Sequence, residues 1–305
     1  MTSGPPDRRR SSDSTSLADL LRSSRRALHD AGIDSADQEA VWLLSAALSL
    51  TPLDIRVHAD RHVDDDAVAR AQVLVTRRVA REPLQYILGT QEFCGREFSV
   101  TPAVLIPRPE TELLVRIARE AIADRANPVL MDVGTGSGCL AVTLACMLPT
   151  ARIFAIDYSP AALDVAQRNA ARYGVRERIE WIHSDLLSAC AERCHDRDVS
   201  VLVANPPYIP DAELDRLQPE VARHEPRLAL AGGPDGLSIF RRLIAEAPRY
   251  LADGATIAIE IGQGQAEAAA EALAAVSAYE SIHVVRDDAG IDRVMVARRR
   301  PASSR

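Results

Sequence analysis

A four-residue loop, Asn205-Pro206-Pro207-Tyr208, contains the groups needed to hold a planar nitrogen for reaction with an electrophile. An amide or exocyclic amino nitrogen is a poor nucleophile because its lone pair is delocalised, so its two hydrogens must be held with the lone pair facing the electrophile. The side-chain oxygen of Asn205 and the backbone carbonyl of Pro206 can each accept one hydrogen. Consecutive prolines stiffen the loop, and the Tyr208 ring can lie flat on a planar group. The loop predicts chemistry at an amide or amino nitrogen, and a proline turn that only closes a strand is the alternative.

A glycine-rich turn, Gly134-Thr135-Gly136-Ser137-Gly138, follows an apolar segment at residues 129–133. Glycines let the backbone turn sharply and let a ligand approach the main chain. Asp157 lies about twenty residues further on, where an acid can accept hydrogen bonds from both hydroxyls of a ribose. Asp185 and Leu186 end another apolar segment and could contact the amino group and the ring of an adenine. These residues predict a nucleoside site, and the Gly-x-Gly-x-Gly spacing favours S-adenosylmethionine over a nicotinamide dinucleotide.

From about Pro109 onward, segments typical of strands alternate with segments typical of helices. Strands are predicted at 129–133, 152–157, 178–183, 199–204, 255–261, 280–286 and 293–298, and helices at 110–123, 138–147, 160–172, 237–250 and 265–276. Strands separated by helices of this length indicate an α/β fold with a parallel, doubly wound sheet. The turn at 287–290 is short, so one of the last two strands should be antiparallel. In such sheets ligands bind at the carboxyl ends of the strands, which is where the glycine turn and the Asn205 loop fall.

The first third of the chain differs from the rest. Residues 17–81 carry only helical patterns, with capping residues at Ser16 and Thr51. Residues 84–108 are expected to form a β-hairpin linker, with strand-like runs at Tyr86-Ile87-Leu88 and Glu97-Phe98-Ser99-Val100. The predicted organisation is a disordered tail at 1–16, a helical domain at 17–83, the linker at 84–108 and the α/β domain at 109–300.

Composition excludes several classes of function. The 305 residues are 47% hydrophobic and 26% charged, with a net charge of −7, which argues against a large nucleic-acid surface. All 36 basic residues are arginines, so a Walker-type or Schiff-base lysine is excluded. No apolar run is long enough to span a bilayer, and the amino terminus lacks the apolar stretch of a secretory signal.

The five cysteines are scattered and odd in number, which suits reduced thiols and a cytoplasmic location better than a disulfide framework. Cys190, Cys194 and His195 lie close together in the sequence, but their spacing matches no usual zinc ligand pair. No metal site is therefore expected.

Several motifs resemble known proteins. Asp132-Val133-Gly134-Thr135-Gly136-Ser137-Gly138 together with the Asn205 loop is similar to the class I amino-methyltransferases. More narrowly, the chain resembles the HemK/PrmC family in three segments: Arg81-Glu82-Pro83-Leu84-Gln85-Tyr86-Ile87-Leu88-Gly89, Leu105-Ile106-Pro107-Arg108-Pro109-Glu110-Thr111-Glu112 and Glu225-Pro226-Arg227-Leu228-Ala229-Leu230. The resemblance extends from about residue 17 to 298. It implies a Rossmann-like methyltransferase domain with a small N-terminal helical bundle, and S-adenosyl-L-methionine as the methyl donor.

The same resemblance implies a substrate and a set of contacts. The family methylates the glutamine of the Gly-Gly-Gln motif in bacterial class I peptide chain release factors, which implies a protein partner and no direct contact with nucleic acid or membrane. Its cofactor contacts fall on Gly134 to Gly138, Asp157, Leu186 and Asn205, and its glutamine contacts on Asn205 to Tyr208. Some relatives have a tryptophan where Leu186 stands, so weaker packing on adenine is expected. The helical domain would help to dock the release factor.

Three alternatives remain at this point. A DNA amino-methyltransferase must flip its target base and needs a basic duplex-binding surface, whereas this chain is acidic. A ribosomal-protein glutamine methyltransferase resembles the family closely, but that group carries a serine after the Pro-Arg pair, where this chain has Pro109-Glu110-Thr111. A non-enzymatic nucleoside-binding module would not need the intact Asn205 and paired prolines.

Overall fold

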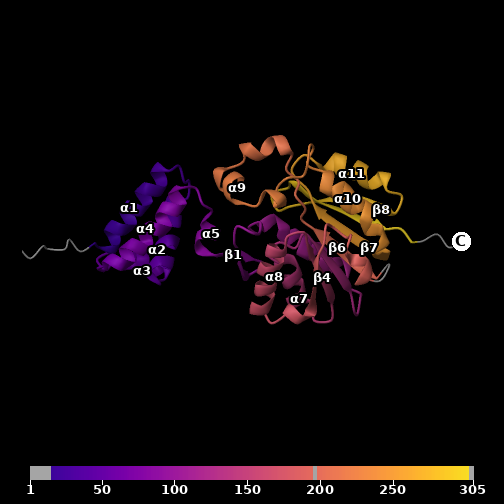
Figure 1. Ribbon diagram of the computed structural model, residues 1–305, viewed down its shortest axis with the longest axis horizontal. Coiled ribbons are helices and arrows are strands. Elements are labelled where there is room, and N and C mark those ends of the chain that lie inside the picture. Colours follow the sequence, from indigo (N-terminus) through magenta and orange to yellow (C-terminus); the bar gives the residue numbers. More distant parts are fainter. Residues whose placement is uncertain (1–14, 195–197, 302–305) are drawn as a thin grey trace, which may run out of the picture. The chain divides into compact units, whose positions relative to one another are not determined.

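The computed structural model describes residues 15–194 and 198–301, and its chain divides into two compact units, Met1–Leu88 and Gly89–Arg305 (Figure 1). Residues 1–14 of the predicted tail lie outside the described residues. Ser16 belongs to the folded part, because its side-chain oxygen accepts a hydrogen bond from the backbone N–H of Asp19 and it bridges to His62. Ser16 therefore caps the first helix, as its residue type predicts.

The first unit is helical. Its helices are α1 (Leu17–Asp30), α2 (Ala36–Leu48), α3 (Pro52–Val57), α4 (Asp65–Val79) and α5 (Leu84–Leu88). Leucines of α1 and α2, among them Leu17, Leu28 and Leu44, are fully buried in one apolar cluster. Thr51 and Asp54 form a reciprocal capping box at the start of α3.

The predicted strand at residues 86–88 is wrong, because these residues belong to α5. The backbone N–H groups of Tyr86 and Ile87 both donate to the carbonyl of Pro83. Tyr86 and Ile87 are both buried. A short apolar run of this kind reads equally as strand or helix from periodicity alone, and the preceding proline favours a helix start.

The second unit begins with the hairpin. Strands β1 (Thr90–Phe93) and β2 (Arg96–Ser99) pair antiparallel across a turn at Cys94 and Gly95, both with positive φ. That backbone matches the twist of a tight hairpin. Phe93 and Phe98 are almost completely buried and pack edge to face.

A seven-stranded sheet forms the centre of the second unit, in the order β5-β4-β3-β6-β7-β9-β8. Its strands are β3 (Val129–Val133), β4 (Arg152–Asp157), β5 (Ile179–His183), β6 (Val199–Ala204), β7 (Leu251–Glu260), β8 (Tyr279–Arg286) and β9 (Asp292–Arg299). The five neighbouring strands β5, β4, β3, β6 and β7 are parallel to one another. Strand β9 runs antiparallel to both of its neighbours, β7 and β8. The predicted parallel sheet with one antiparallel strand near the end of the chain is confirmed.

Helices cover both faces of this sheet (Figure 1). The α-helices of this unit are α6 (Glu112–Ala121), α7 (Cys139–Met147), α8 (Pro160–Arg172), α9 (Pro219–His224), α10 (Ser238–Glu246) and α11 (Ala266–Ala275). The 3-10 helices are η1 (Pro109–Thr111), η2 (Arg176–Arg178), η3 (Cys190–Glu192), η4 (Asp211–Arg216), η5 (Arg227–Ala229) and η6 (Ala247–Arg249). Alternate residues of β3 face opposite sides: Leu130 packs with α6 and α7, whereas Met131 packs with α10 and α11. This two-sided burial explains why the parallel strands are continuous apolar runs.

Strand order reverses between β3 and β6. The chain proceeds from β3 outward through β4 to β5, and then returns to the other side of β3 with β6 and β7. Val133 pairs with Ala204 across this junction, so the segments that follow both residues leave the sheet side by side. Such a reversal opens a crevice at the carboxyl ends of the strands.

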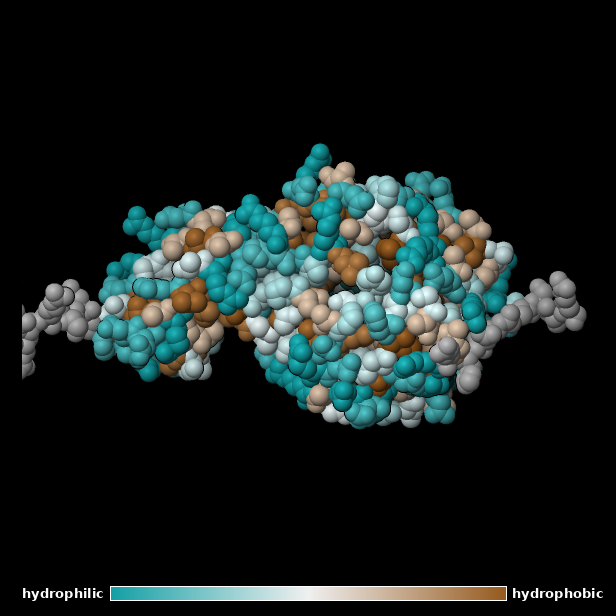
Figure 2. Space-filling model, in the orientation of Figure 1, coloured by the Kyte–Doolittle hydropathy of each residue, from teal (hydrophilic) through white to brown (hydrophobic). Residues whose placement is uncertain are grey.

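The face drawn in Figure 2 is largely hydrophilic, with apolar residues in separate small patches. No helix in the described part of the chain has the combined length and apolar character needed to cross a bilayer.

A buried ion pair gives a test of the helical unit. Arg78 on α4 donates from Nε to Glu39 on α2 at 2.5 Å, and both side chains are less than a tenth exposed. Removing Glu39 takes away the carboxylate that faces the buried guanidinium of Arg78, and breaking a buried pair in this way is strongly destabilising. We predict that Glu39→Ala lowers the free energy of unfolding by about 3–5 kcal/mol, measured by urea titration of the full chain with Trp42 fluorescence in a Trp181→Phe background.

The matched control is Asp37→Ala on the same helix. Its carboxylate pairs with Arg25 but is 87% exposed, so the expected loss is at most about 1 kcal/mol. Equal losses in the two variants would contradict the prediction.

Candidate active site

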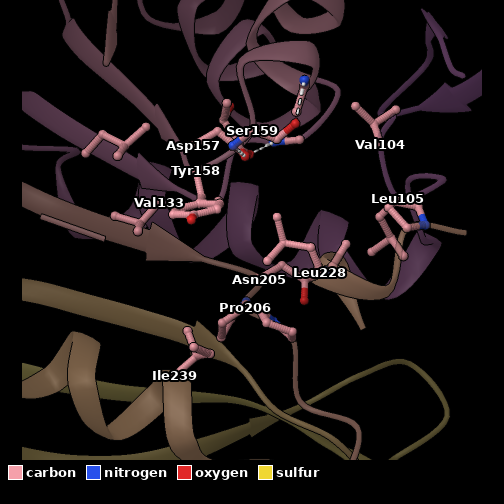
Figure 3. Close-up of a pocket in the computed structure, with 18 of the residues that line it drawn as sticks. Val104, Leu105, Val133, Asp157, Tyr158, Ser159, Asn205, Pro206, Leu228 and Ile239 are labelled. Carbon is pink, nitrogen blue, oxygen red and sulfur yellow. Dashed lines mark hydrogen bonds between the residues drawn. The ribbon is translucent and has the colours of Figure 1, made fainter. Parts of the chain in front are cut away.

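A cavity of about 660 Å³ lies at the carboxyl ends of β3, β4, β5 and β6. Its volume is in the range of about 300–1,000 Å³ typical of small-molecule sites. Most residues singled out from the sequence line it: Gly134, Thr135, Gly136, Ser137, Asp157, Asp185, Leu186, Asn205, Pro206 and Pro207. Figure 3 shows Asp157, Tyr158 and Ser159 on one side of this space, with Asn205, Pro206 and Ile239 on another. Gly138 and Tyr208 are the two predicted site residues that do not line it.

The glycine turn begins where β3 ends. Gly134 and Gly136 both have positive φ, and the N–H groups of Gly134 and Thr135 donate to the carbonyl of Ile156 on β4. Gly138 has a different task, because a Cβ there would lie 2.9 Å from the Cβ of Ala166. Gly138 thus allows α7 to start close against α8, and the first two glycines shape the cavity wall.

Asp157 is fixed in the cavity by backbone groups. Its Oδ2 accepts from the N–H of Gly136 and its Oδ1 from the N–H of Ser159, each at 2.8 Å. Burial raises the pKa of this carboxyl, and the hydrogen bonds from backbone N–H groups oppose that shift. Each oxygen keeps a further lone pair, so the carboxylate can also accept hydrogen bonds from two hydroxyls.

A second aspartate, Asp132, lies completely inside the protein. Its Oδ2 accepts from the hydroxyl of Thr135 at 2.6 Å and from the N–H of Ala141 at 3.1 Å, so it ties the glycine turn to α7. Burial is the main cause that raises its pKa from 3.8 to about 7. Its Oδ1 is buried without a hydrogen-bond partner, which suits a carboxyl group that keeps its proton.

Asn169 on α8 connects the turn to the hairpin. Its side-chain nitrogen donates to the carbonyls of Ser137 and Ser99, and its oxygen accepts from the N–H of Ser99. The side chain is almost fully buried, and all of these bonds are 2.8–3.0 Å long. Asn169 therefore joins the hairpin to the glycine turn, which lines the cavity, and so helps to fix the position of that turn.

Tyr158, Leu186 and Asp185 form another part of the cavity lining. Tyr158, which follows Asp157, is 58% exposed and lines the cavity together with Leu186. Asp185 also lines it, but its Oδ2 accepts from Arg242 at 2.9 Å. A planar ring can pack between Tyr158 and Leu186, and the aromatic side chain provides packing surface that Leu186 alone lacks.

Asn205 lies directly after β6 and is half-buried. Its side-chain nitrogen donates to the hydroxyl of Thr111 at 3.0 Å. Thr111, at the end of η1, donates in turn to Oε2 of Glu260 at 2.7 Å. Thr111 and Glu260 are almost completely buried. The nitrogen of Asn205 is thus engaged by the protein, which leaves its oxygen as the atom that can accept from a ligand.

Tyr208 faces the same glutamate. Its hydroxyl donates to Oε1 of Glu260 at 3.4 Å, and its backbone carbonyl accepts from Gln265 at 2.9 Å. Burial raises the pKa of Tyr208 to about 12 and that of Glu260 to about 7. The predicted stacking of the Tyr208 ring on a substrate stays a prediction.

An ion pair between Arg108, which lines the cavity, and the buried Glu225 lies beside the site. Arg108 Nη2 donates to Oε1 of Glu225 at 2.5 Å, and the Glu225 side chain is 1% exposed. Burial raises the pKa of Glu225, and the guanidinium of Arg108 opposes that shift. The pair joins the 105–112 segment to η5, whose Leu228 is 56% exposed and lines the cavity.

Several of these residues had no predicted role. Thr111, Arg108 and Glu225 lie in segments that carry the family resemblance, but their contacts join positions far apart in the sequence. Glu260 could have been found, because it is an acid at the end of a predicted strand, as Asp157 is. Tyr158 adjoins the predicted site residue Asp157, and Asp132 lies two positions before Gly134.

The cysteines are free thiols, and Cys139, Cys190 and Cys194 are buried. Among the described residues no group of three or more potential ligands could hold a metal ion. His195, considered with Cys190 and Cys194 above, lies outside the described residues.

Comparisons with known proteins agree with this geometry. A family model described as the PrmC N-terminal domain matches residues 19–89, and one described as ribosomal protein L11 methyltransferase (PrmA) matches residues 109–225. Among solved structures, the hMettl16 catalytic domain in complex with the MAT2A 3'UTR hairpin 6 has a TM-score of 0.55 at 14% identity, over 81% of this chain and 87% of that one. At this identity the likeness concerns the fold. The sheet and its cavity are those of a Rossmann-like methyltransferase.

Curated relatives identify the family. The release factor glutamine methyltransferase of Geobacter sulfurreducens is 43% identical over 92% of this chain and 95% of its own length. The protein of the same name from Moorella thermoacetica is 42% identical over 93% of this chain and 99% of its own length. The chain belongs to the release factor glutamine methyltransferase family.

Asp132 gives the site a testable pH dependence. Below pH 3.8 the carboxyl is protonated in both folded and unfolded chains, but between about pH 4 and 7 only the unfolded chain ionises it. Its contribution to stability is therefore lost as the pH rises toward 7. We predict that Asp132→Asn, which cannot ionise, gains about 3 kcal/mol relative to the wild type between pH 5 and pH 8.

Urea unfolding of both proteins at the two pH values measures this change. The difference between the proteins isolates Asp132, since all other groups titrate in both. Stability curves that stay parallel across this range would contradict it.

Proposed function

We propose that this chain transfers a methyl group from S-adenosyl-L-methionine to the side-chain amide nitrogen of the glutamine in the Gly-Gly-Gln motif of class I peptide chain release factors. The observation that carries the proposal is the Asn205 side chain, whose nitrogen is held by Thr111 in the cavity that also contains Asp157. The name shared by relatives about 40% identical over nearly the whole chain supports a glutamine acceptor over a base amine or a ribosomal protein.

The cavity fits this cofactor in its donors, acceptors and shape. Asp157 can accept from the ribose hydroxyls, and the backbone of residues 134–137, which line the cavity, can approach the methionine part, as proposed for the glycine turn. The adenine would lie between Tyr158 and Leu186, near the Asp185 carboxylate. Gly138 would contribute indirectly, by allowing α7 to approach α8.

The residues that would act on the substrate lie across the cavity. When bound, the cofactor supplies an electrophilic methyl group. The Asn205 oxygen and the Pro206 carbonyl would accept the two amide hydrogens and so direct the nitrogen lone pair into the cavity. Asn205 and Pro206 can do this without rearrangement, since the loop is stiffened by prolines. Directly after methyl transfer the amide nitrogen still carries both hydrogens and is positively charged. In this state it is strongly acidic, so it releases one proton to water and gives the neutral N-methylamide.

Catalysis in this scheme is mainly orientation, which can supply up to about 7–11 kcal/mol of barrier reduction for well-aligned reactants. The Arg108–Glu225 pair and the apolar Leu228 form the wall against which a protein loop would bind. Tyr208 would help to hold the Asn205-Pro206-Pro207-Tyr208 loop in place through the hydrogen bond from its hydroxyl to Glu260.

The partner is proposed to be the release factor itself, bound in part by the helical unit. Five large apolar residues of that unit are exposed: Trp42, Leu53, Val57, Val73 and Val79. Exposed apolar side chains of this size can supply contacts to a protein partner. We also propose that the enzyme is cytoplasmic, because release factors act in translation and bacterial translation takes place in the cytoplasm.

Asn205 provides the test of the mechanism. We predict that Asn205→Ala lowers kcat at least about 100-fold, because one of the two acceptors for the amide hydrogens is lost. Binding of S-adenosylhomocysteine, measured by calorimetry, should change by less than about 5-fold. Asn127→Ala, at an exposed loop position, is the matched control and should retain full activity. Full activity of Asn205→Ala would overturn the mechanism.

The substrate assignment needs a separate experiment. Purified enzyme with methyl-labelled cofactor should label a class I release factor, and should not label the same factor with its motif glutamine changed to alanine. Duplex DNA offered in parallel should remain unlabelled. Equal labelling of both release factors, or labelling of the DNA, would exclude the proposed acceptor.

A further inference from the structure

The amide of Asn205 can point either way at almost no steric cost. Its oxygen and nitrogen are nearly equal in size, so two orientations related by a half-turn fill the same space. Only one of them offers an acceptor to the substrate amide. The other would set the NH₂ group of Asn205 against the NH₂ group of the substrate, donor against donor. Something must therefore select the productive orientation.

The structure contains a buried chain of hydrogen bonds that can make this selection. Asn205 Nδ2 donates to Thr111 Oγ1 at 3.0 Å, and Thr111 Oγ1 donates to Glu260 Oε2 at 2.7 Å. Thr111 is 2% exposed and Glu260 is 1% exposed, so water does not compete for these positions. The chain brings together η1, the end of β7 and the loop after β6.

The direction of the chain follows from its last member. An ionised carboxylate can only accept, so the single hydroxyl hydrogen of Thr111 is committed to Glu260. Thr111 is then left with lone pairs alone for Asn205, and these can meet only the amide nitrogen. The Asn205 oxygen is thereby turned away from Thr111.

We infer that Glu260, acting through Thr111, is a positioning residue that fixes the Asn205 amide with its oxygen toward the substrate nitrogen. This inference rests on the proposed function, because it assigns a role within the same site. Neither Glu260 nor Thr111 touches the reacting atoms in this scheme.

The charges around Glu260 set its protonation state, and this state determines whether the hydrogen-bond chain holds Asn205 in the productive orientation. Tyr208 donates to Oε1, Arg293 on β9 favours the ionised carboxylate, and Glu110 on η1 opposes it. Burial dominates and raises the pKa of Glu260 to about 7. A protonated Glu260 can donate to Thr111, which can then donate to Asn205 and favour the wrong orientation. At saturating cofactor, kcat should therefore fall as the pH drops below about 7.

Three variants test the chain by activity. Thr111→Val removes the hydroxyl at nearly constant volume. Glu260→Gln can direct its NH₂ group to Thr111 while its oxygen accepts from the Tyr208 hydroxyl. Each should lower kcat about 10- to 100-fold and leave KM for the release factor within about 3-fold. Thr111→Ser keeps the hydroxyl and should restore kcat to within about 3-fold of the wild type. Glu260→Gln should also lose the fall in kcat below pH 7.

A spectroscopic readout separates positioning from general damage. The chain has only three asparagines, Asn127, Asn169 and Asn205, so selective ¹⁵N-asparagine labelling gives three side-chain amide signals. The Asn205 signal is assigned by its loss in Asn205→Ala. In Thr111→Val and Glu260→Gln this signal should shift or broaden, and the buried Asn169 signal should stay in place and report an intact fold.

The outcomes distinguish this inference from the function on which it rests. One outcome is that Asn205→Ala is inactive while Thr111→Val keeps the wild-type kcat and an unmoved Asn205 signal. This outcome would overturn the role inferred for Thr111 and Glu260 and would leave the proposed mechanism intact. A fully active Asn205→Ala would overturn the mechanism itself. If Thr111→Val also moved the Asn169 signal, its fold would be altered, and Thr111→Ser and the wild-type pH profile would decide instead. A low kcat in Thr111→Ser would overturn the role inferred for Thr111 and Glu260. A wild-type kcat that stays constant from pH 6 to 8 would also overturn it.

Discussion

The reversal of strand order between β3 and β6 is the constraint on which the site depends. It sets the ends of two parallel strands side by side, with Val133 paired to Ala204, so the glycine turn and the Asn205 loop leave the sheet at the same point. A ligand that contacts one loop must then lie within reach of the other. The proposed methyl donor and the proposed nitrogen acceptor meet because of this register, and helices on both faces hold it by burying alternate residues of each strand.

Burial at this edge also sets the protonation of three acids. Burial is the leading cause that raises the pKa of Asp132, Asp157 and Glu260, but their partners differ. Asp157 accepts only from backbone N–H groups and has lone pairs to spare, which suits a binding carboxylate. Asp132 keeps one oxygen without a partner, which suits a neutral carboxyl with a structural task. One sheet edge can therefore contain three acids without three buried negative charges.

Sequence patterns predicted the local part of this arrangement. Gly134 and Asp157 could be placed because Gly134 follows a strand and Asp157 ends one, and the position of strand ends is a local feature. Gly138 could not be separated from the other glycines, since its reason is the approach of Ala166 from another helix. Thr111 and Glu260 are 149 positions apart, and only the folded chain joins them. The misassigned strand at 86–88 has the same origin, because a short apolar run does not specify its own conformation.

The stiffness of a catalytic loop and the orientation of its side chain are separate problems. Prolines fix the backbone after Asn205, but they cannot decide which end of a nearly symmetric amide faces the substrate. That choice needs a neighbour with only one hydrogen-bonding role, and a carboxylate is such a neighbour because it has no hydrogen to give. Thr111 hydrogen-bonds to both Glu260 and Asn205, so it passes the preference of Glu260 on, as a hydroxyl can donate on one side and accept on the other. Since the carboxylate lies at the end of the strand next to β6, the same register that joins the two loops also positions the group that orients Asn205.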